Sequence, residues 1–323
     1  MLRLEQGIHI AASCGGSGGV SIIDSLLDIT DNVTSITGVA DNGGHSGEIR
    51  SELGVLPPGD ATHQMAIHIR NLRFRRKFTL RLDSGVRPGN TFLAGAQIDE
   101  GSQSEAIKSL EEEFKSYKGR VIPISNQALH LRVCLEDGKC YDGEKYIDDH
   151  KIGASPIKDI FYLDQDMNPT IPEPNPEALD AILNCKIFMI VPGTLWGTQM
   201  QILKIPGFRE ALAITKAPIV WICNSVNTAE TYGYRTSDFA KRFVDVLGRP
   251  IDFALIDKPD YNLPANYEDE KTLFVEDDLK ETKSIVKKVI KGPFSKPEFI
   301  GGKVVIRHEG ERVVDRLKLA LAA

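Results

Sequence analysis

Residues 8–19 read IHIAASCGGSGG, and residues 33–47 read VTSITGVADNGGHSG. Each stretch begins with a short run of apolar and β-branched residues and ends in a cluster of glycines, which is typical of a strand followed by a tight turn. Between them, apolar residues recur at helical spacing from residue 20 to residue 27. Two strands joined by a helix within about 30 residues form a βαβ unit, whose strands are parallel and whose crossover is right-handed.

The rest of the chain continues this alternation of strands and helices. Strands that are apolar throughout are what a parallel sheet needs when helices cover both of its faces. The pattern therefore predicts an α/β fold: a Rossmann-like, doubly wound, mostly parallel sheet with helices on both faces. Further strands are expected at residues 187–191, 218–223 and 253–256, and helices at residues 61–73, 103–115 and 176–184.

Residues 120–165 differ in character from the rest of the chain. Short β-rich segments alternate there with turn sequences such as Asp142-Gly143, which indicates hairpins. We expect one large α/β domain over residues 1–323, with this segment as a small β-rich excursion within it. The apolar spacing over residues 313–321 predicts a final helix that packs on the core.

The charge balance excludes several kinds of partner. The 323 residues include 39 lysines and arginines against 45 aspartates and glutamates, a net charge of −6, which disfavours nucleic acid and anionic lipid. No stretch reaches the ~18 apolar residues that a membrane span needs. The basic run from Arg70 to Arg81 is interpreted as a solvated helix edge, with an anionic ligand or a subunit contact as alternatives.

Five cysteines without CxxC spacing indicate neither a disulfide framework nor a tetrahedral zinc site, and a reducing cytoplasm is expected. Cys14 and Cys223 end predicted strands with no evident activating base, so both are interpreted as buried structural residues. His63 and His68 lie five residues apart on one predicted helix and do not form a metal-binding pair. His68 is expected to be structural.

The first glycine cluster, Gly15, Gly16, Ser17 and Gly18, is expected to bind a phosphate. Glycines let the backbone approach the anion, and the N-terminus of the next helix attracts it; the alternative is a tight turn without a ligand. A P-loop would need a Lys-Ser/Thr pair after the last glycine, and a GxGxxG motif would need a glycine where Ser21 stands. No Walker-type ATPase is implied, and no tightly bound flavin or NAD is expected.

The second glycine cluster follows the second strand. Asp41 opens it, and a divalent metal such as Mg²⁺ shared by Asp41 and Asp60 is one hypothesis for these carboxylates. The simpler role for Asp60 is that of a helix cap, worth about 1 kcal/mol. His45 is expected to be a solvated turn residue. The residues expected to approach a phosphate here are Asn42, Gly43, Gly44, Ser46 and Gly47.

Further turns complete the predicted ligand site. If strand 187–191 lies beside the first strand, the turn after it faces the first glycine cluster and could enclose a diphosphate. One helix N-terminus contributes about 0.3–1 kcal/mol, whereas micromolar binding needs about 8 kcal/mol, so base and sugar contacts are also required. The residues expected to contact the ligand from these turns are Gly89, Asn90, Pro192, Gly193, Thr194, Asn224, Thr231 and Tyr234.

The motifs, taken in order, are GGSG at 15–18, VADNGGHSGEIR at 39–50, LPPGD at 56–60, GNTFLA at 89–94, VPGTLW at 191–196, CN at 223–224, and ETYGY with SD within 230–238. This series resembles the phospholactate transferase and gluconeogenesis-factor family, often written CofD/YvcK-like. The resemblance extends from about residue 8 to residue 258 and includes the family's usual small β excursion.

The resemblance implies one of two functions. One branch of the family moves a phospholactyl group from a guanosine diphosphate-linked donor to a deazaflavin with a divalent metal. The other binds uridine diphospho-sugars and is associated with carbon metabolism and cell shape, without a recognised reaction. The motifs look more like the second branch, so we expect a UDP-sugar-binding regulator rather than an enzyme. The alternative is a transferase in which Asp41 and Asp60 are the catalytic, metal-binding residues.

Several residues depart from the family's pattern. Asn42 stands where a second aspartate is common, His45 for a serine, Glu48 for an arginine, and Thr62-His63 for Arg-Asn. Fewer carboxylates weaken a magnesium site, and fewer arginines remove bidentate contacts to phosphate. Either the ligand differs, or the basic run supplies the missing charge. The sequence leaves the oligomeric state, including a homodimer, open.

Overall fold

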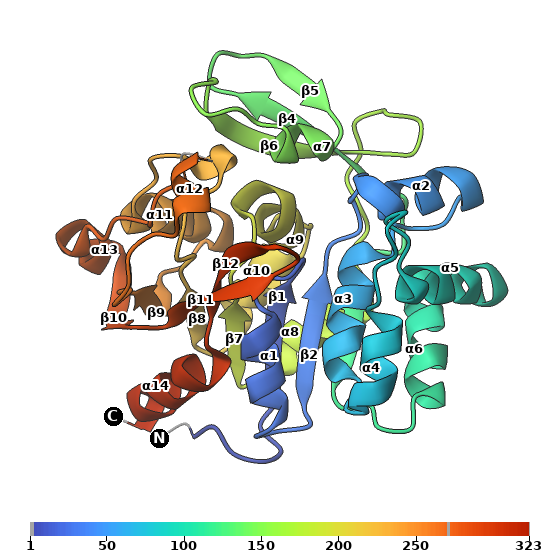
Figure 1. Ribbon diagram of the computed structural model, residues 1–323, viewed down its shortest axis with the longest axis horizontal. Coiled ribbons are helices and arrows are strands. Elements are labelled where there is room, and N and C mark those ends of the chain that lie inside the picture. The colour runs from blue at the N-terminus through green and yellow to red at the C-terminus, as the bar shows by residue number, and fades with distance from the viewer. Residues whose placement is uncertain (1–2, 270–271, 323) are drawn as a thin grey trace.

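The computed structural model describes residues 3–269 and 272–322. Its centre is a seven-stranded parallel sheet in the order β10-β9-β8-β7-β1-β2-β3, with helices on both faces (Figure 1). The predicted α/β, Rossmann-like fold is confirmed. The strands are β1 (Ile10–Cys14), β2 (Val33–Thr37), β3 (Arg120–Pro123), β7 (Ile187–Ile190), β8 (Ile219–Ile222), β9 (Ile251–Asp257) and β10 (Val286–Gly292).

The order of the strands reverses between β1 and β7. From β1 the chain builds the sheet outward through β2 to β3, and from β7 it builds the sheet the other way through β8 and β9 to β10. The strand at 187–191 therefore does lie beside the first strand, with Ile10 paired to Ile187 and Ser13 to Ile190. Ligands of open α/β sheets bind outside the carboxyl ends of the strands at such a switch point.

Side chains alternate along β1 between two apolar cores. Ile10 and Ala12 face the core under α1 (Val20–Leu27) and α14 (Gly310–Ala322), and Ala11 faces the opposite one. The helices α8 (Pro176–Asn184), α10 (Phe208–Ile214) and α11 (Thr236–Leu247) cover that opposite face. The final helix packs on the core as predicted, because it buries Val313, Val314, Leu317 and Leu321.

A group of helices packs beside β2 and β3. The helix predicted over residues 61–73 is in fact two helices, because the chain turns after His68 and Asn71 caps a new helix by accepting hydrogen bonds from the backbone N–H groups of Arg73 and Phe74. A further helix begins inside the second glycine cluster. The group consists of α2 (Gly44–Leu53), α3 (Gly59–His68), α4 (Leu72–Phe78), α5 (Pro88–Glu100) and α6 (Gln103–Glu113).

The β-rich excursion lies over the carboxyl edge of the main sheet, at the top of Figure 1. Its antiparallel sheet has the order β5-β4-β6, with α7 (Lys145–Asp148) after β5. The predicted start at residue 120 was wrong, because β3 pairs with β2 in the main sheet. The strands of the excursion are β4 (His130–Leu135), β5 (Cys140–Asp142) and β6 (Ile157–Leu163).

The remaining elements are short. They are η1 (Leu195–Met200, a π-helix), α9 (Gln201–Leu203), η2 (Ala229–Thr231), α12 (Ala265–Asp269), α13 (Leu279–Ile285), β11 (Ser295–Ile300) and β12 (Lys303–His308).

No helix within residues 3–269 and 272–322 has the length and apolar character needed to cross a membrane.

The basic run is not simply a solvated helix edge. Arg70, between α3 and α4, forms ion pairs with Asp24 of α1 and with Asp28 at the C-terminal cap of that helix. Arg75 of α4 also binds Asp24, so these two arginines fix α1 against α4 and the segment before it. Arg73, at the start of α4, is exposed as expected. Arg81 lies after α4 and lines a cavity at the carboxyl edge of the main sheet.

Gly310 allows α14 to start against α1, because a Cβ at this position would lie 1.9 Å from the Ser21 carbonyl oxygen. We expect Gly310→Ala to lower the free energy of unfolding by about 1–3 kcal/mol through this clash. The matched control is Gly95→Ala on α5, where a Cβ meets nothing within 4 Å and helix propensity should raise stability by up to about 1 kcal/mol. Urea denaturation measures both, and equal stabilities would contradict the packing described here.

Candidate functional site

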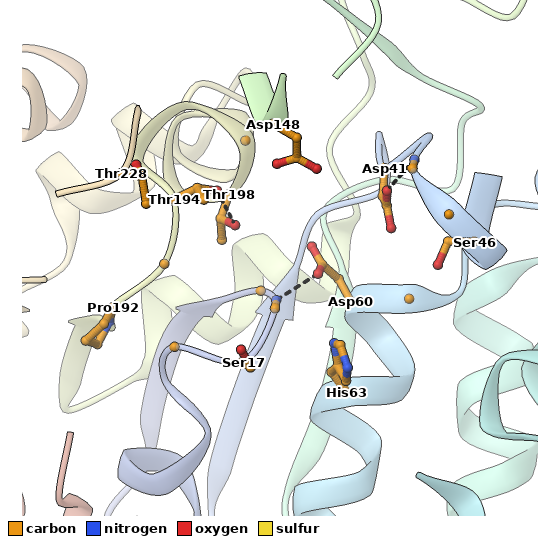
Figure 2. A pocket seen from close by; sticks show the side chains of 18 of the residues that line it. Ser17, Asp41, Ser46, Asp60, His63, Asp148, Pro192, Thr194, Thr198 and Thr228 are labelled. Carbon is orange, nitrogen blue, oxygen red and sulfur yellow. Dashed lines mark hydrogen bonds between the residues drawn. The ribbon is translucent and has the colours of Figure 1, made fainter. Parts of the chain in front are cut away.

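A cavity of about 580 Å³ opens at the switch point between β1 and β7 (Figure 2). Loops that follow β1, β2, β7 and β8 line it, together with the start of α3, the excursion and the end of β12. Segments far apart in the sequence therefore meet at one edge of the sheet. The lining includes the predicted residues Gly15, Gly16, Ser17, Gly18, Asp41, Gly43, Gly44, Ser46, Asp60, Asn90, Pro192, Gly193, Thr194 and Asn224.

The loops after β1 and β7 touch each other. A Cβ on Gly18 would lie 2.5 Å from the carbonyl oxygen of Pro192, so only glycine allows this approach. Gln199 joins the two strand ends, since its amide donates to the Val191 carbonyl (2.7 Å) and its Oε1 accepts from the Ser13 hydroxyl (2.6 Å). These contacts hold both loops in place beside the cavity.

The loop at residues 192–194 is also fixed from its other side. The Asn224 amide donates to the Gly193 carbonyl at 2.8 Å. The buried Glu230 carboxylate accepts the backbone N–H groups of Leu195 (2.7 Å) and Trp196 (3.2 Å) at the start of η1. Burial raises the pKa of Glu230 to about 7.

Asp60 does not act as the helix cap that the sequence suggested. Pro58 occupies the N-cap position of α3 and makes no side-chain capping bond. The Asp60 carboxylate instead accepts the backbone N–H of Gly16 at 2.8 Å, which joins α3 to the first glycine loop (Figure 2). Burial, followed by the negative charges of Asp41 and Asp148, raises the pKa of Asp60 to about 7.

Asp41 organises the second glycine loop. One carboxylate oxygen accepts the backbone N–H of Gly43 at 2.8 Å, and burial raises the pKa of Asp41 above its ordinary value. Gly59 packs directly against this loop, because a Cβ there would lie 2.3 Å from the Ser46 hydroxyl oxygen and 2.9 Å from Asp41 Oδ2. The start of α3 therefore sits against the loop that carries Asp41.

The excursion adds two more carboxylates to the cavity. Glu144 and Asp148 lie one helical turn apart at α7, and both line the cavity. Burial, with the charges of Asp148, Asp41 and Asp60, raises the pKa of Glu144 to about 9. Its Oε2 atom is buried with no hydrogen-bond partner among the described residues. Glu144 is therefore protonated at neutral pH.

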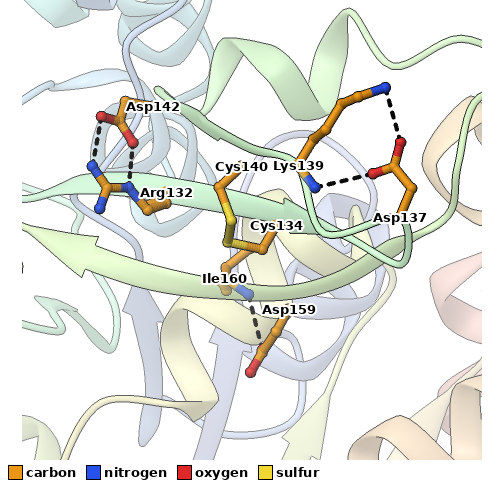
Figure 3. Close-up of a disulfide and its surroundings, with 8 residues drawn as sticks. All are labelled: Arg132, Cys134, Asp137, Lys139, Cys140, Asp142, Asp159 and Ile160. Atoms are coloured by element: carbon orange, nitrogen blue, oxygen red, sulfur yellow. Dashed lines mark hydrogen bonds and ion pairs between the residues drawn. A yellow bond between two sulfur atoms is a disulfide. The ribbon is translucent and has the colours of Figure 1, made fainter.

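The excursion is cross-linked by a disulfide between Cys134 on β4 and Cys140 on β5 (Figure 3). The expectation of no disulfide was therefore wrong: the two cysteines are directly opposite each other in an antiparallel pair, a neighbourhood that spacing along the chain does not show. Beside it, Arg132 and Asp142 form an ion pair at 2.6 Å. Cys140 therefore ties β5, the strand that precedes Glu144 and α7, to β4.

Three arginines approach the cavity close to His63. Burial, and then the positive charges of Arg87, Arg81 and Arg307, lower the pKa of His63 to about 4, so its ring is neutral. Arg87 hydrogen-bonds to that ring, and Arg307 enters from the end of β12. None of the three arginines forms an ion pair with a carboxylate within the part of the chain that the structure describes. The cavity thus holds three arginines without a direct ion pair among the described residues, although the charge of Asp41 acts on Arg87.

Five residues that the sequence singled out do not line the cavity, and each has a structural role instead. Asn42 Oδ1 accepts the backbone N–H of Lys145 at 2.9 Å and so joins the second loop to the excursion, and Gly47 packs on the Asn42 backbone. Gly89 packs beneath the Phe78 ring. Thr231 completes the capping box of η2 by accepting the backbone N–H of Thr228, and Tyr234 packs edge-on against Phe239.

Other lining residues were missed or assigned differently. His45 is not a solvated turn residue, since it lines the cavity with its ring 3.4 Å from the backbone nitrogen of Arg87. Helical spacing could have pointed to Thr198, four residues after Thr194, and to the pair Glu144 and Asp148. Nothing local marked the residues from distant segments. The lining residues not singled out as ligand contacts include His63, Arg81, Arg87, Glu144, Asp148, Thr198, Gln201, Ser225, Thr228, Ile306, Arg307 and His308.

These features define a Rossmann-like α/β protein with a polar cavity at the switch point of its sheet. The family model described as "2-phospho-L-lactate transferase CofD" matches residues 10–295, and the chain belongs to this family.

Relatives and solved structures agree with this assignment. A Thermotoga maritima protein named "Putative gluconeogenesis factor" is 30% identical over 95% of this chain and 98% of its own. The "Gluconeogenesis factor" of Halalkalibacterium halodurans is 32% identical over 72% of each chain. The crystal structure of a UPF0052 family member from Bacillus halodurans superposes with a TM-score of 0.85 at 27% identity, covering 98% of this chain and all of that one.

The buried Glu144 predicts how stability depends on pH. An acid whose pKa rises from 4.5 to about 9 on folding binds more protons in the folded state between these values, so its contribution lowers stability as pH rises. Glu144→Gln should remove this effect and stabilise the protein at pH 8 by on the order of 2 kcal/mol more than at pH 5. Chemical denaturation at both pH values measures the difference. The exposed control Glu112→Gln should show no such change, and an equal response of the two variants would contradict the burial of Glu144.

Proposed function

We propose that this protein binds a nucleotide diphospho-sugar of the UDP-sugar type in the cavity at the switch point and acts in the cytoplasm as a regulator of carbon metabolism and of the cell envelope. The observation that carries the proposal is the meeting of three backbone turns, at residues 15–18, 43–44 and 192–194, with three arginines that make no direct ion pair within the described residues, in one cavity. A volume of about 580 Å³ is within the range of small-molecule sites. The gluconeogenesis-factor names of the relatives support the regulatory side of the proposal.

The diphosphate would lie between the glycine turns and the arginines. Backbone N–H groups at glycine turns bind phosphate oxygens, and arginine adds short bidentate bonds to the same group. The family's pattern places arginines where this chain has Glu48 and Thr62. In this chain Arg81, Arg87 and Arg307 supply positive charge to the cavity. Only Arg81 belongs to the basic run noted in the sequence.

In the transferase that the family resemblance leaves as the alternative, a magnesium ion would bind here together with the donor. No group of three or more His, Cys, Asp or Glu side chains in the described segments is arranged to hold a metal. Asp41 and Asp60 nevertheless fit a magnesium site that ligand phosphates complete, because Mg²⁺ in such sites takes one or two carboxylates plus phosphate oxygens. The ion would neutralise charge on the diphosphate. Asp41 and Asp60 would hold it from the second glycine loop and from the start of α3.

A phospholactyl transferase that uses a guanosine diphosphate-linked donor is the second candidate. The specific observation in its favour is the pair of carboxylates, Asp41 and Asp60, in the same cavity as the arginines, with the pKa of Asp60 raised to about 7. In this candidate Asp41 and Asp60 would hold a metal that neutralises charge on the leaving diphosphate. The description of the matching family model agrees with this candidate at the level of the family.

Calorimetric titration with UDP-glucose and with guanosine diphosphate, each with and without Mg²⁺, separates the candidates. Uridine-selective binding that does not need the metal supports the regulator. Guanosine-selective binding that requires the metal supports the transferase. If neither nucleotide binds under either condition, both proposals fail, and the glycine turns are structural only.

Removing one arginine should weaken the complex without unfolding the protein. We expect Arg87→Met and Arg307→Met each to reduce the affinity for UDP-glucose by about tenfold or more, because each loses a charged hydrogen bond to phosphate. Arg316→Met, on the exposed side of α14, changes the net charge equally and is the control. Calorimetry measures the affinities and circular dichroism checks the fold. An equal, small loss in all three variants would show that only long-range charge acts.

A further inference from the structure

A second, smaller cavity, of about 140 Å³, adjoins the first between α3, α4 and α5. Thr62 and Phe78 are part of its lining. No residue of the turns at 15–18, 43–44 and 192–194 is among those that line it. The second cavity is therefore a separate place for part of a ligand, next to the proposed position of the diphosphate. The lining residues that the two cavities share are His63, Arg81, Arg87 and Asn90.

Arginines set the charge of the second cavity. No carboxylate of the described residues lines it, whereas Arg81 and Arg87 both do. Arg81 is exposed and makes no hydrogen bond or ion pair within the part of the chain that the structure describes. Burial, and then the charge of Arg81, lower the pKa of Arg87, although Asp41 opposes this from the first cavity. An anion between two guanidinium groups that repel each other stabilises the charge of both.

The polar groups around Arg87 hold it in place and leave room for an acidic ligand group. Arg87 donates to Nε2 of His63, whose ring is neutral because burial, and then the nearby arginines, lower its pKa to about 4. The Thr62 hydroxyl donates to Asn90 Oδ1 at 2.6 Å. These two acceptors are thus already occupied, whereas the Asn90 amide N–H groups make only contacts of 3.5 Å. The second cavity offers donors to a ligand rather than acceptors.

The second cavity begins a short distance from the first glycine turn. Asp60 accepts the backbone N–H of Gly16, and His63 follows three residues later on α3 (Figure 2). Three residues of an α-helix advance about 4.5 Å along its axis, a distance that a single sugar ring can span. Asp148 lies far from His63 across the first cavity, and its charge would repel a second acidic group there.

We propose that the ligand is a nucleotide diphospho-sugar whose sugar carries a carboxylate, and that this carboxylate lies in the second cavity between Arg81 and Arg87. The inference rests on the proposed function, because it takes the diphosphate to lie at the glycine turns. A carboxylate matches the planar donor fork of a guanidinium group. Arg307 lines only the first cavity and serves the diphosphate. Arg81 selects for the carboxylate, and Arg87 acts on both anionic groups.

Calorimetry with UDP-glucuronate and UDP-glucose tests this proposal, because the two ligands differ only where a carboxylate replaces a hydroxymethyl group on the sugar. We expect UDP-glucuronate to bind the unmodified protein at least about tenfold more tightly than UDP-glucose. Arg81→Met should remove most of this preference and change the affinity for UDP-glucose by no more than about twofold. Arg307→Met should weaken both ligands by the same factor and keep the preference, and Arg316→Met should change neither affinity.

The outcomes separate this inference from the proposed function. If UDP-glucose binds the unmodified protein as tightly as UDP-glucuronate or more tightly, the inference is wrong and the proposed function stands. If neither ligand binds, both are wrong. If added inorganic phosphate raises the affinity for UDP-glucose to that for UDP-glucuronate, the second cavity holds a free anion, and the carboxylate proposal is overturned. A preference that survives in folded Arg81→Met would place the carboxylate elsewhere. The comparison of ligands on the unmodified protein remains decisive if a variant does not fold.

Discussion

The parallel pairing of β1 with β7 is the constraint on which the rest of this structure depends. It places the turn after β1 against the turn after β7, so closely that Gly18 has room for no side chain beside the Pro192 carbonyl. The buried amide of Gln199 then joins the two strand ends through Val191 and Ser13. Backbone groups of two loops become one surface in this way, which neither loop could form alone.

The electrostatics of the first cavity follow from what this surface gathers around it. Asp41, Asp60, Asp148 and Glu144 bring carboxylates into a buried space. Burial raises the pKa of each, and the charges of neighbouring carboxylates raise it further for Asp60, Asp148 and Glu144. Close by, burial and then the charges of three arginines lower the pKa of His63 and leave its ring neutral. Charge of both signs that is desolvated and unpaired costs stability, and such groups cluster at functional sites. A ligand phosphate would offset the cost of burying the arginines, and a ligand hydroxyl or a bound metal ion would offset the cost of burying the carboxylates.

The sequence was informative wherever one strand and the turn after it carried the whole signal. The predicted strand at 187–191 and its turn, Pro192 to Thr194, are of this kind, and so is the βαβ unit at the start of the chain. The edge strand β10 was not predicted, because its lysines interrupt the apolar run expected of a strand in a covered parallel sheet. Arg307 could not be predicted as a cavity residue, since it enters from a hairpin about 300 residues away from the first glycine loop. The disulfide could not be predicted either, because it depends on the register of β4 against β5, which the local sequence does not show.

The positions of the arginines in the structure suggest how this chain can depart from the family's pattern and still bring positive charge to the cavity. A binding site requires charge at a position in the cavity, and the fold can deliver that charge from any segment that reaches it. Glu48 on α2 and Thr62 on α3 stand where the family resemblance implies arginines, whereas Arg81 and Arg87 come from the segment between α4 and α5. Arg307 comes from β12, beyond the segment that the family model matches. Under the proposed function, the sheet and its glycine turns would fix where the anion lies, and the surrounding segments would determine how its charge is balanced.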